Sequence, residues 1–261
     1  MTKVLITGMS GLIGGLIGRH LQERGGYELT ALNRSPVEGV RCHRADIADL
    51  EAIKPAFAGQ DVVVHCAAYV EDINNWEGNL SGNIIGVYNV FEAARLAGVK
   101  RVVFASSGAA ISSFLYEEPY NAIVTGRWED IPPSWPMITH DLACPATKYG
   151  AAKVWGEAIG RHFSDEHGMS VLCVRIGSTR RENRPMTSYH YSIYLSHRDV
   201  VQIHYKSMVA PDDVRYDIFM ATSKNRLGFY DLEHPREVIG YEPEDSVDVF
   251  DTREQVPKFT P

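Results

Sequence analysis

Lys3-Val4-Leu5-Ile6-Thr7-Gly8-Met9-Ser10-Gly11-Leu12-Ile13-Gly14 is the stretch that decides the fold of this chain. Residues 3–7 form a short apolar run rich in β-branched side chains, which is typical of a buried parallel strand. Residues 12–21 then follow a helical period. We therefore predict a strand, a tight glycine turn and a helix, in that order.

The three glycines of this turn have the spacing of a phosphate-binding loop. Gly8 permits the tight turn, Gly11 lets the backbone approach a pyrophosphate, and Gly14 lets the helix pack close to the strand. The first N–H groups of the helix are then free to bind phosphates. A turn that binds nothing is the alternative, but the strand–turn–helix context favours a dinucleotide. The residues between the glycines that we also expect beside this cofactor are Ser10, Leu12 and Ile13.

The residue that contacts the adenosine ribose in such folds is expected nineteen residues after Gly14, at position 33. An Asp or Glu here accepts hydrogen bonds from the ribose hydroxyls of NAD. This chain has Asn33, which does not repel a 2′-phosphate, followed by Arg34, which can pair with one. We expect NADP or NAD, with NADP slightly favoured. The alternative, that Arg34 is an ordinary solvated loop arginine, remains open.

Strands and helices alternate along the rest of the chain. Such alternation produces right-handed βαβ units, so we expect an α/β fold with a doubly wound parallel sheet covered on both faces. The expected strands after the first are around residues 28–33, 40–47, 61–68, 101–108, 170–177 and 215–221. The expected helices after the first are at residues 49–58, 83–97, 146–167 and 198–208.

The ends of these strands supply further candidate cofactor contacts. Asp46 is placed to meet the adenine edge, and the small residues after the fourth strand allow a cofactor to lie across its end. The expected contacts of this kind are Asp46, Ile47, Cys66, Ala67, Ala68, Ala105 and Ile176.

Tyr149 and Lys153 carry the candidate chemistry. They are one helical turn apart, so both side chains project from one face of a helix. A phenol is a poor base at pH 7, but a nearby ammonium and an oxidised nicotinamide favour the phenolate. Ser107, at the end of the fifth strand, can hold the substrate oxygen against the tyrosine. These three residues predict hydride and proton transfer at a hydroxyl or carbonyl group.

These motifs resemble the extended short-chain dehydrogenase/reductase superfamily, also called the NAD-dependent epimerase/dehydratase family. The resemblance rests on the glycine turn, Asp46-Ile47, His65-Cys66-Ala67-Ala68, Asn83-Ile84-Ile85-Gly86, Ser106-Ser107 and the Tyr149/Lys153 pair. It implies a Rossmann-type fold and roles for particular residues. Asn83 would help to order the site, Tyr149 and Ser107 would act on the substrate oxygen, and Lys153 would bind the nicotinamide ribose.

A closer resemblance is to small uronate dehydrogenases and related sugar dehydrogenases. It rests on residues 82–95, 103–107, 174–178, 196–199 and 240–245. In that group Asn and His typically follow the second serine and touch the sugar, whereas this chain has Gly108 and Ala109. A serine expected after the fourth strand is replaced near Tyr69, and the carboxylate-binding arginine could be Arg184. The candidate substrate contacts are Tyr69, Ser106, Ser107, Gly108 and Arg184.

Composition is that of a globular enzyme. Hydrophobic residues make up 44% of the 261 residues, and the net charge is −7 without a basic patch, so we expect no nucleic-acid partner. The absence of a transmembrane-length apolar run and of a signal peptide predicts a cytoplasmic protein without a membrane partner. The four cysteines have no C-x-x-C spacing and the ten histidines have no ligand spacing, so we expect no metal site.

We expect one Rossmann-fold domain over residues 1–261, with cap segments at about 108–145 and 178–261. The segment between Ser107 and Tyr149 is long and aromatic. Its aromatic residues either line a substrate pocket or form a lid, or else pack on the core or on a second subunit. Residues 177–194 contain arginines that could bind a carboxylate or phosphate, or could be solvated.

We rank a dehydrogenase or reductase for a small sugar, sugar acid or related carbonyl compound first. Only 84 residues follow Gly177 (261 − 177), which leaves little chain for a lobe that grips a nucleotide. A sugar or nucleotide-sugar epimerase or dehydratase with retained NAD(P) is the second reading, and a non-catalytic NADP-sensing protein is the third. Relatives pair through the helices expected at residues 83–97 and 146–167, so a homodimer is expected.

Overall fold

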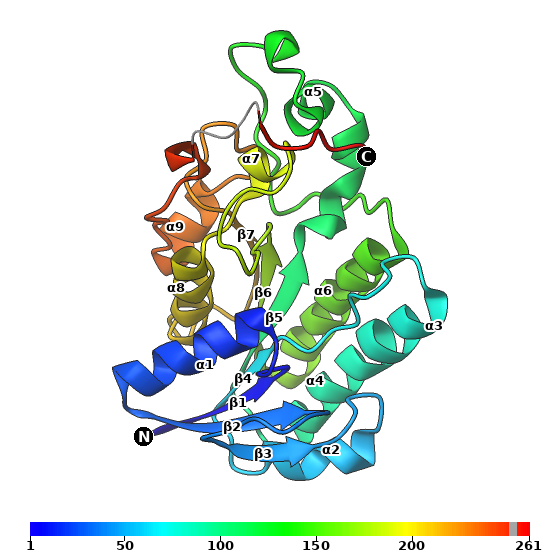
Figure 1. Ribbon diagram of the computed structural model, residues 1–261. Helices are drawn as coiled ribbons and strands as arrows, with labels where there is room; N and C mark the ends of the chain where they lie inside the picture. Colours follow the sequence, from blue (N-terminus) through cyan, green and yellow to red (C-terminus); the bar gives the residue numbers. More distant parts are fainter. Residues whose placement is uncertain (251–254) are drawn as a thin grey trace.

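A seven-stranded parallel sheet forms the centre of the molecule (Figure 1). The structure, a computed structural model, describes residues 1–250 and 255–261. The strand order is β3-β2-β1-β4-β5-β6-β7 and every paired strand is parallel to its neighbour. The strands are β1 Thr2–Thr7, β2 Tyr27–Asn33, β3 Arg41–Arg44, β4 Val62–His65, β5 Arg101–Ser107, β6 Ser170–Ile176 and β7 Tyr216–Ala221. The Rossmann-type fold predicted from the sequence is confirmed.

The chain winds outward from β1 to β3 and then returns to place β4 on the other side of β1. The strand order therefore reverses between β1 and β4. In open parallel sheets a ligand binds beside the carboxyl ends of the strands at such a switch point. This is where the glycine turn lies.

Helices cover both faces of the sheet (Figure 1). On one face, α1 Leu12–Arg24 and α8 His197–Met208 pack over a core that includes Ile17, Leu21 and Val200. On the other, α2 Leu50–Phe57, α4 Gly86–Leu96 and α6 Lys148–His167 enclose a second core. The remaining helical elements are α3 Trp76–Gly78, η1 Asn79–Ile85, η2 Gly108–Tyr116, α5 Tyr120–Thr125, η3 Trp128–Asp130, α7 His190–Ile193, α9 Glu233–Ile239 and η4 Val247–Val249.

Element boundaries differ from the prediction at a few positions for local reasons. α6 begins at Lys148 because the Thr147 hydroxyl accepts a hydrogen bond from the backbone N–H of Gly150, which makes Thr147 the N-cap. The helix expected from Asn83 begins instead as the π-helical η1, which runs directly into α4. β3 ends at Arg44, because the Asp46 carboxylate accepts from the N–H of Ala48 and starts a turn.

The two predicted cap segments share a third core above the carboxyl ends of β5–β7 (Figure 1). Tyr120 and Trp128 pack into this core, Trp135 donates its indole N–H to the carbonyl of Gly228, and only Tyr116 among the aromatic residues of 108–145 is strongly exposed, at 61%. Of the two alternatives for this segment, packing on the core therefore accounts for most of its aromatic side chains. No helix of the described chain is long and apolar enough to cross a membrane.

Candidate active site

The glycine turn is built for close backbone approach. Gly8 has a φ of +70°, and a Cβ there would lie 2.7 Å from the backbone nitrogen of Ala67. A Cβ on Gly14 would lie 2.5 Å from the carbonyl oxygen of Gly8. Gly11 provides the N-terminal boundary of α1, and no side chain caps the first N–H groups of that helix. The turn thus keeps free backbone donors facing the switch point, as a pyrophosphate requires.

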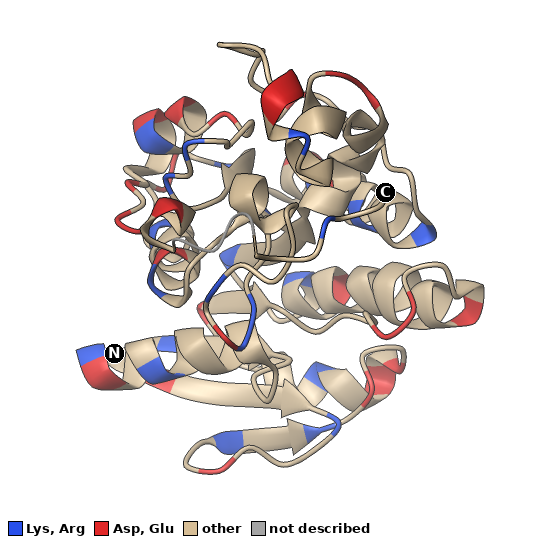
Figure 2. Cartoon of the chain, turned by 45° about the horizontal axis from the view of Figure 1, so that its top comes forward, with Lys and Arg blue, Asp and Glu red and all other residues tan. Residues whose placement is uncertain are grey.

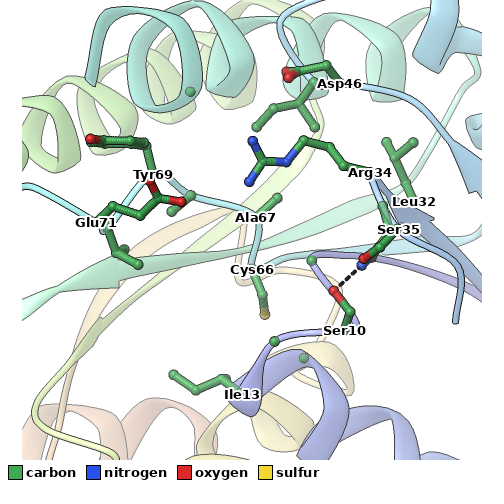
Figure 3. A pocket seen from close by; sticks show the side chains of 18 of the residues that line it. Ser10, Ile13, Leu32, Arg34, Ser35, Asp46, Cys66, Ala67, Tyr69 and Glu71 are labelled. Carbon is green, nitrogen blue, oxygen red and sulfur yellow. Dashed lines mark hydrogen bonds between the residues drawn. The ribbon is translucent and has the colours of Figure 1, made fainter. Parts of the chain in front are cut away.

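A groove of about 640 Å³ opens over this turn (Figure 3). This volume is in the range of small-molecule and cofactor sites. Its walls contain most of the cofactor-contact residues expected from the sequence: Gly8, Ser10, Gly11, Leu12, Ile13, Gly14, Asn33, Arg34, Asp46, Ile47, Cys66, Ala67 and Ala68. A cradle without Cβ atoms at the turn, free helix N–H groups and a groove along the strand ends fit a dinucleotide.

Two expected ribose contacts have different surroundings. Asn33 is buried; its side-chain oxygen accepts from the N–H of Met9 at 2.8 Å and its amide donates to the hydroxyl of Ser10 at 2.5 Å. It therefore holds the glycine turn rather than reaching outward. Arg34 is exposed, and its side chain extends over the groove between Asp46 and Ala67 (Figure 3). Arg34 is the cation that a 2′-phosphate would meet.

Lys153 lies deep below the end of β5. Its side chain is 2% exposed, its Nζ donates to the carbonyl of Ala105 at 2.7 Å, and it stands 5.5 Å from the ring centre of Tyr149. A Cβ on Gly150 would lie 2.3 Å from the carbonyl oxygen of Ala109, so the start of α6 lies directly against the residues that follow Ser107. The structure thus brings Tyr149, Lys153 and the end of β5 together, as the sequence predicted.

A buried ion pair fixes α6 in this position. Glu157, one turn after Lys153, accepts from Nε and Nη2 of Arg175 at 2.9 and 2.8 Å. Ser106 donates its hydroxyl to the same carboxylate at 2.6 Å and is 2% exposed. Burial alone lowers the pKa of Arg175, but the hydrogen bonds and charge of Glu157 outweigh it and raise that pKa. Ser106 therefore supports the helix, which differs from the substrate contact expected for it, whereas the hydroxyl of Ser107 accepts only from the N–H of Ala109 in the described chain.

Asn83 orders the loop after β4. Its amide oxygen accepts from the N–H of Tyr69, and its amide nitrogen donates to the carbonyl of Tyr69 and to Asn79. Tyr69 in turn lies in the wall of the groove, with the backbone of Gly78 and Gly82 packed against it. The ordering role implied for Asn83 thus has a direct structural counterpart, and it acts through backbone groups.

The candidate substrate residues are placed unevenly. Ser107 pairs across β5 and β6 with Ile176, one of the expected cofactor contacts. Arg184 is exposed in the loop before α7, outside the walls of the groove. Gly108 is buried, and a Cβ there would lie 1.9 Å from the hydroxyl oxygen of Tyr230. Sequence reasoning did not select Tyr230, because nothing in its local pattern indicates that it reaches the end of β5.

The structure also assembles three potential metal ligands that the histidine spacing did not suggest. His140, Asp217 and His234 have ligand atoms within 4.8 Å of one another. The two imidazole rings stack at 3.8 Å with an angle of 11° between their planes, and His234 is hydrogen-bonded to Asp217 at 2.7 Å. Lone pairs in two parallel ring planes do not converge on one ion, so this arrangement is that of a stacked pair.

The sheet, the glycine cradle and the Tyr149/Lys153 pair define an oxidoreductase of the extended short-chain dehydrogenase/reductase class. Comparison with known proteins places the chain more closely. It belongs to the NAD dependent epimerase/dehydratase family, whose model matches residues 4–189, and it is uronate dehydrogenase-like.

Two curated relatives match the chain along nearly their whole length. The chain is 30% identical to the NAD-dependent glucose-6-phosphate dehydrogenase of Haloferax volcanii, covering 93% of each chain. It is 30% identical to a uronate dehydrogenase of Agrobacterium fabrum, covering 100% of this chain and 91% of the relative. A solved mutant of uronate dehydrogenase from Agrobacterium tumefaciens, complexed with NAD, superposes with a TM-score of 0.80 at 28% identity, covering 100% of this chain and 92% of that one.

Proposed function

We propose that this enzyme is an NAD(P)-dependent dehydrogenase that oxidises a hydroxyl group of a small free sugar or sugar acid. The observation that carries the proposal is the placement of Tyr149 and Lys153 together at the end of β5, where the charge of Lys153 also acts on Cys66 in the wall of the groove. Sugar dehydrogenases that match the chain over 91–93% of their own length support the choice of substrate class.

In the proposed mechanism the substrate hydroxyl lies between Ser107 and Tyr149. The Ser107 hydroxyl holds the substrate oxygen, and the Tyr149 phenolate accepts its proton as the carbon–oxygen double bond forms. The Lys153 ammonium stabilises that phenolate, because an opposite charge nearby favours the ionised form. A bound nicotinamide supplies the hydride acceptor. Reduction of a carbonyl would reverse each of these proton movements.

The proposal assigns the cofactor to the groove over the glycine turn. The backbone of Gly8–Gly14 would hold the pyrophosphate, Asp46 and Ile47 the adenine, and Lys153 with the strand ends at Ala105 and Ile176 the nicotinamide half. NAD is the cofactor named for relatives. The exposed guanidinium of Arg34 supports use of NADP as well, since it lies over the groove and no carboxylate of the described chain pairs with it.

A homodimer is part of the proposal. The adjacent helices α4 and α6 expose apolar side chains to solvent, namely Ile85 just before α4, Tyr88, Leu96 and Trp155, at 38–51%. Apolar side chains of neighbouring helices can form an isologous interface between two copies. Light scattering should give a mass of twice 29.1 kDa, and Y88E should reduce it to the monomer value. The four unpaired cysteines support a reducing, cytoplasmic location.

The experiment that tests this function follows absorbance at 340 nm with NAD⁺ or NADP⁺ and a panel of aldoses, uronates, sugar phosphates and simple alcohols. Stoichiometric appearance of reduced cofactor with a free sugar or sugar acid is the expected result. Tight cofactor binding without net reduction on any member of the panel would contradict it and would favour an epimerase or dehydratase. Failure to bind either nucleotide would contradict both readings.

A further inference from the structure

The hydroxyl of Tyr230 occupies the space that a side chain at position 108 would need. Gly108 directly follows Ser107, and a Cβ on it would lie 1.9 Å from Oη and 3.0 Å from Cζ of Tyr230. Contacts below 3.0 Å to a fixed ring are not tolerated, so glycine at 108 and tyrosine at 230 depend on each other. The phenol thus reaches the carboxyl edge of the sheet, beside the residue proposed to hold the substrate oxygen.

Tyr230 is held rigidly in this position. It is 2% exposed and belongs to the third core, and the segment around it forms a bridge with Ile138, whose N–H donates to the carbonyl of Phe229 at 2.7 Å. Its ring also contacts that of Phe229 edge to face. A side chain fixed on both sides in this way presents its hydroxyl at one defined place.

The hydroxyl itself has no hydrogen-bond partner among the described residues, although the ring is almost completely buried. Other buried tyrosines are satisfied: Tyr241 donates to the carbonyl of Thr222 at 2.8 Å, and Tyr120 donates to the carbonyl of Pro136 at 3.0 Å. A phenol hydroxyl without a protein partner is available to donate to a bound ligand, which a phenylalanine cannot do. Burial also raises the pKa of Tyr230 well above its usual range, so the group stays a neutral donor.

We propose that Tyr230 is a substrate-positioning residue that hydrogen-bonds a second oxygen of the bound sugar, on the side of Ser107 away from the reacting carbon. The inference rests on the proposed function. Position 108 then contributes only its backbone, and the polar group for this part of the site comes from a distant segment between β7 and α9. The ligand class is a polyhydroxylated ring, because a simple alcohol has no second oxygen to offer.

The test compares wild type with Tyr230→Phe, using steady-state kinetics on the sugar that wild type oxidises. We expect KM for this sugar to rise about 2- to 13-fold, the range for one neutral hydrogen bond, with KM for the cofactor unchanged. The melting temperature should not fall, since no internal hydrogen bond of the described chain is lost. A set of monodeoxy analogues completes the cycle: one of them should raise the wild-type KM by the same factor and leave that of Y230F unaffected.

Two further variants separate positioning from structure. Tyr241→Phe is the matched control, because it removes a buried phenol hydroxyl with a structural partner; it should lower the melting temperature and leave KM for the sugar unchanged. Gly108→Ala should raise KM in the wild-type background and have a smaller effect in Y230F, where the closest atom to the new Cβ is gone.

The outcomes are distinguishable from those of the proposed function. If wild type oxidises a sugar and Y230F has the same KM for it and for every deoxy analogue, the role of Tyr230 is refuted while the sugar dehydrogenase stands. If wild type oxidises only simple alcohols, or nothing, the proposed function fails and the role of Tyr230 fails with it.

Discussion

The buried pair of Glu157 and Arg175 leads to a prediction that can be worked out quantitatively. Their side chains are only 4% and 2% exposed, and the carboxylate accepts from Arg175 twice and from Ser106 once. Glu157→Ala leaves a guanidinium in the interior whose only remaining partner among residues 1–250 and 255–261 is the carbonyl of Leu142. Removing one member of a buried pair costs about 3–5 kcal/mol, because the remaining charge is desolvated and uncompensated.

The assay is urea denaturation followed by circular dichroism, with activity measured in parallel. We expect the free energy of unfolding of E157A to fall by about 3–5 kcal/mol, corresponding to a melting temperature lower by roughly 10 °C in a chain of this size. Because α6 also carries Tyr149 and Lys153, kcat should fall even at a temperature where E157A is fully folded.

Two control variants define what the result means. Asp165→Ala breaks a pair with Arg161 on the same helix, but both side chains are more than half exposed, so little stability should be lost. The triple variant S106A/E157L/R175M replaces the buried polar group by apolar side chains and should recover most of the stability lost in E157A. If the free energy of unfolding of E157A falls by less than about 1 kcal/mol and its slope against urea concentration is unchanged, the argument that this pair holds α6 is refuted.

Four further predictions follow from the site and the core. Tyr149→Phe should lower kcat by at least about 100-fold and leave NAD(P)⁺ affinity measured by fluorescence unchanged; a variant with near-normal turnover would show that Tyr149 does not move the proton. Arg34→Ala should weaken NADP⁺ binding about 10- to 100-fold and leave NAD⁺ affinity unchanged, whereas the control Arg41→Ala, also at an exposed arginine, should affect neither. Equal effects of Arg34→Ala on both cofactors would mean that Arg34 is only a solvated loop residue. Gly14→Ala should abolish cofactor binding in calorimetry, because its Cβ would lie 2.5 Å from the oxygen of Gly8; retained affinity would contradict the cradle. The free energy of unfolding should fall as pH decreases from about 6.5 to about 4, because burial lowers the pKa of His190 and His204 to about 4. In that range the unfolded chain takes up protons at these histidines and the folded chain does not. A urea midpoint that does not change with pH, or a pH dependence of the midpoint that is the same in His204→Gln as in wild type, would contradict this.

The fold was predictable because its signals are local. The run at residues 3–7, the glycines after it and the alternation of strands and helices each depend on a few neighbouring side chains. The same holds for Tyr149 and Lys153, which share a helix face at any tertiary arrangement. The order of the predicted elements and the Tyr149/Lys153 pair agree with the structure, while element bounds shift by up to three residues.

What the sequence did not reveal depends on contacts between distant segments. Asn33 was expected to face a ribose, but the N–H of Met9 needs an acceptor and takes its side-chain oxygen. Ser106 was expected to touch substrate, but alternation along β5 turns it toward Glu157. Tyr230 reaches Gly108 only through the packing of a loop that no local pattern places there.

The third core has a consequence for how such an enzyme could acquire a new substrate. It draws Ile123, Ile138, Tyr191, Phe229 and Val247 from five separate stretches of the chain into one cluster. Exchanging any one stretch for that of a relative would remove part of a shared interior, so loop grafting should generally yield unstable chimaeras. Changes of specificity are better sought in single side chains that point from this cluster toward the end of β5, where a substitution alters recognition without dismantling the support beneath it.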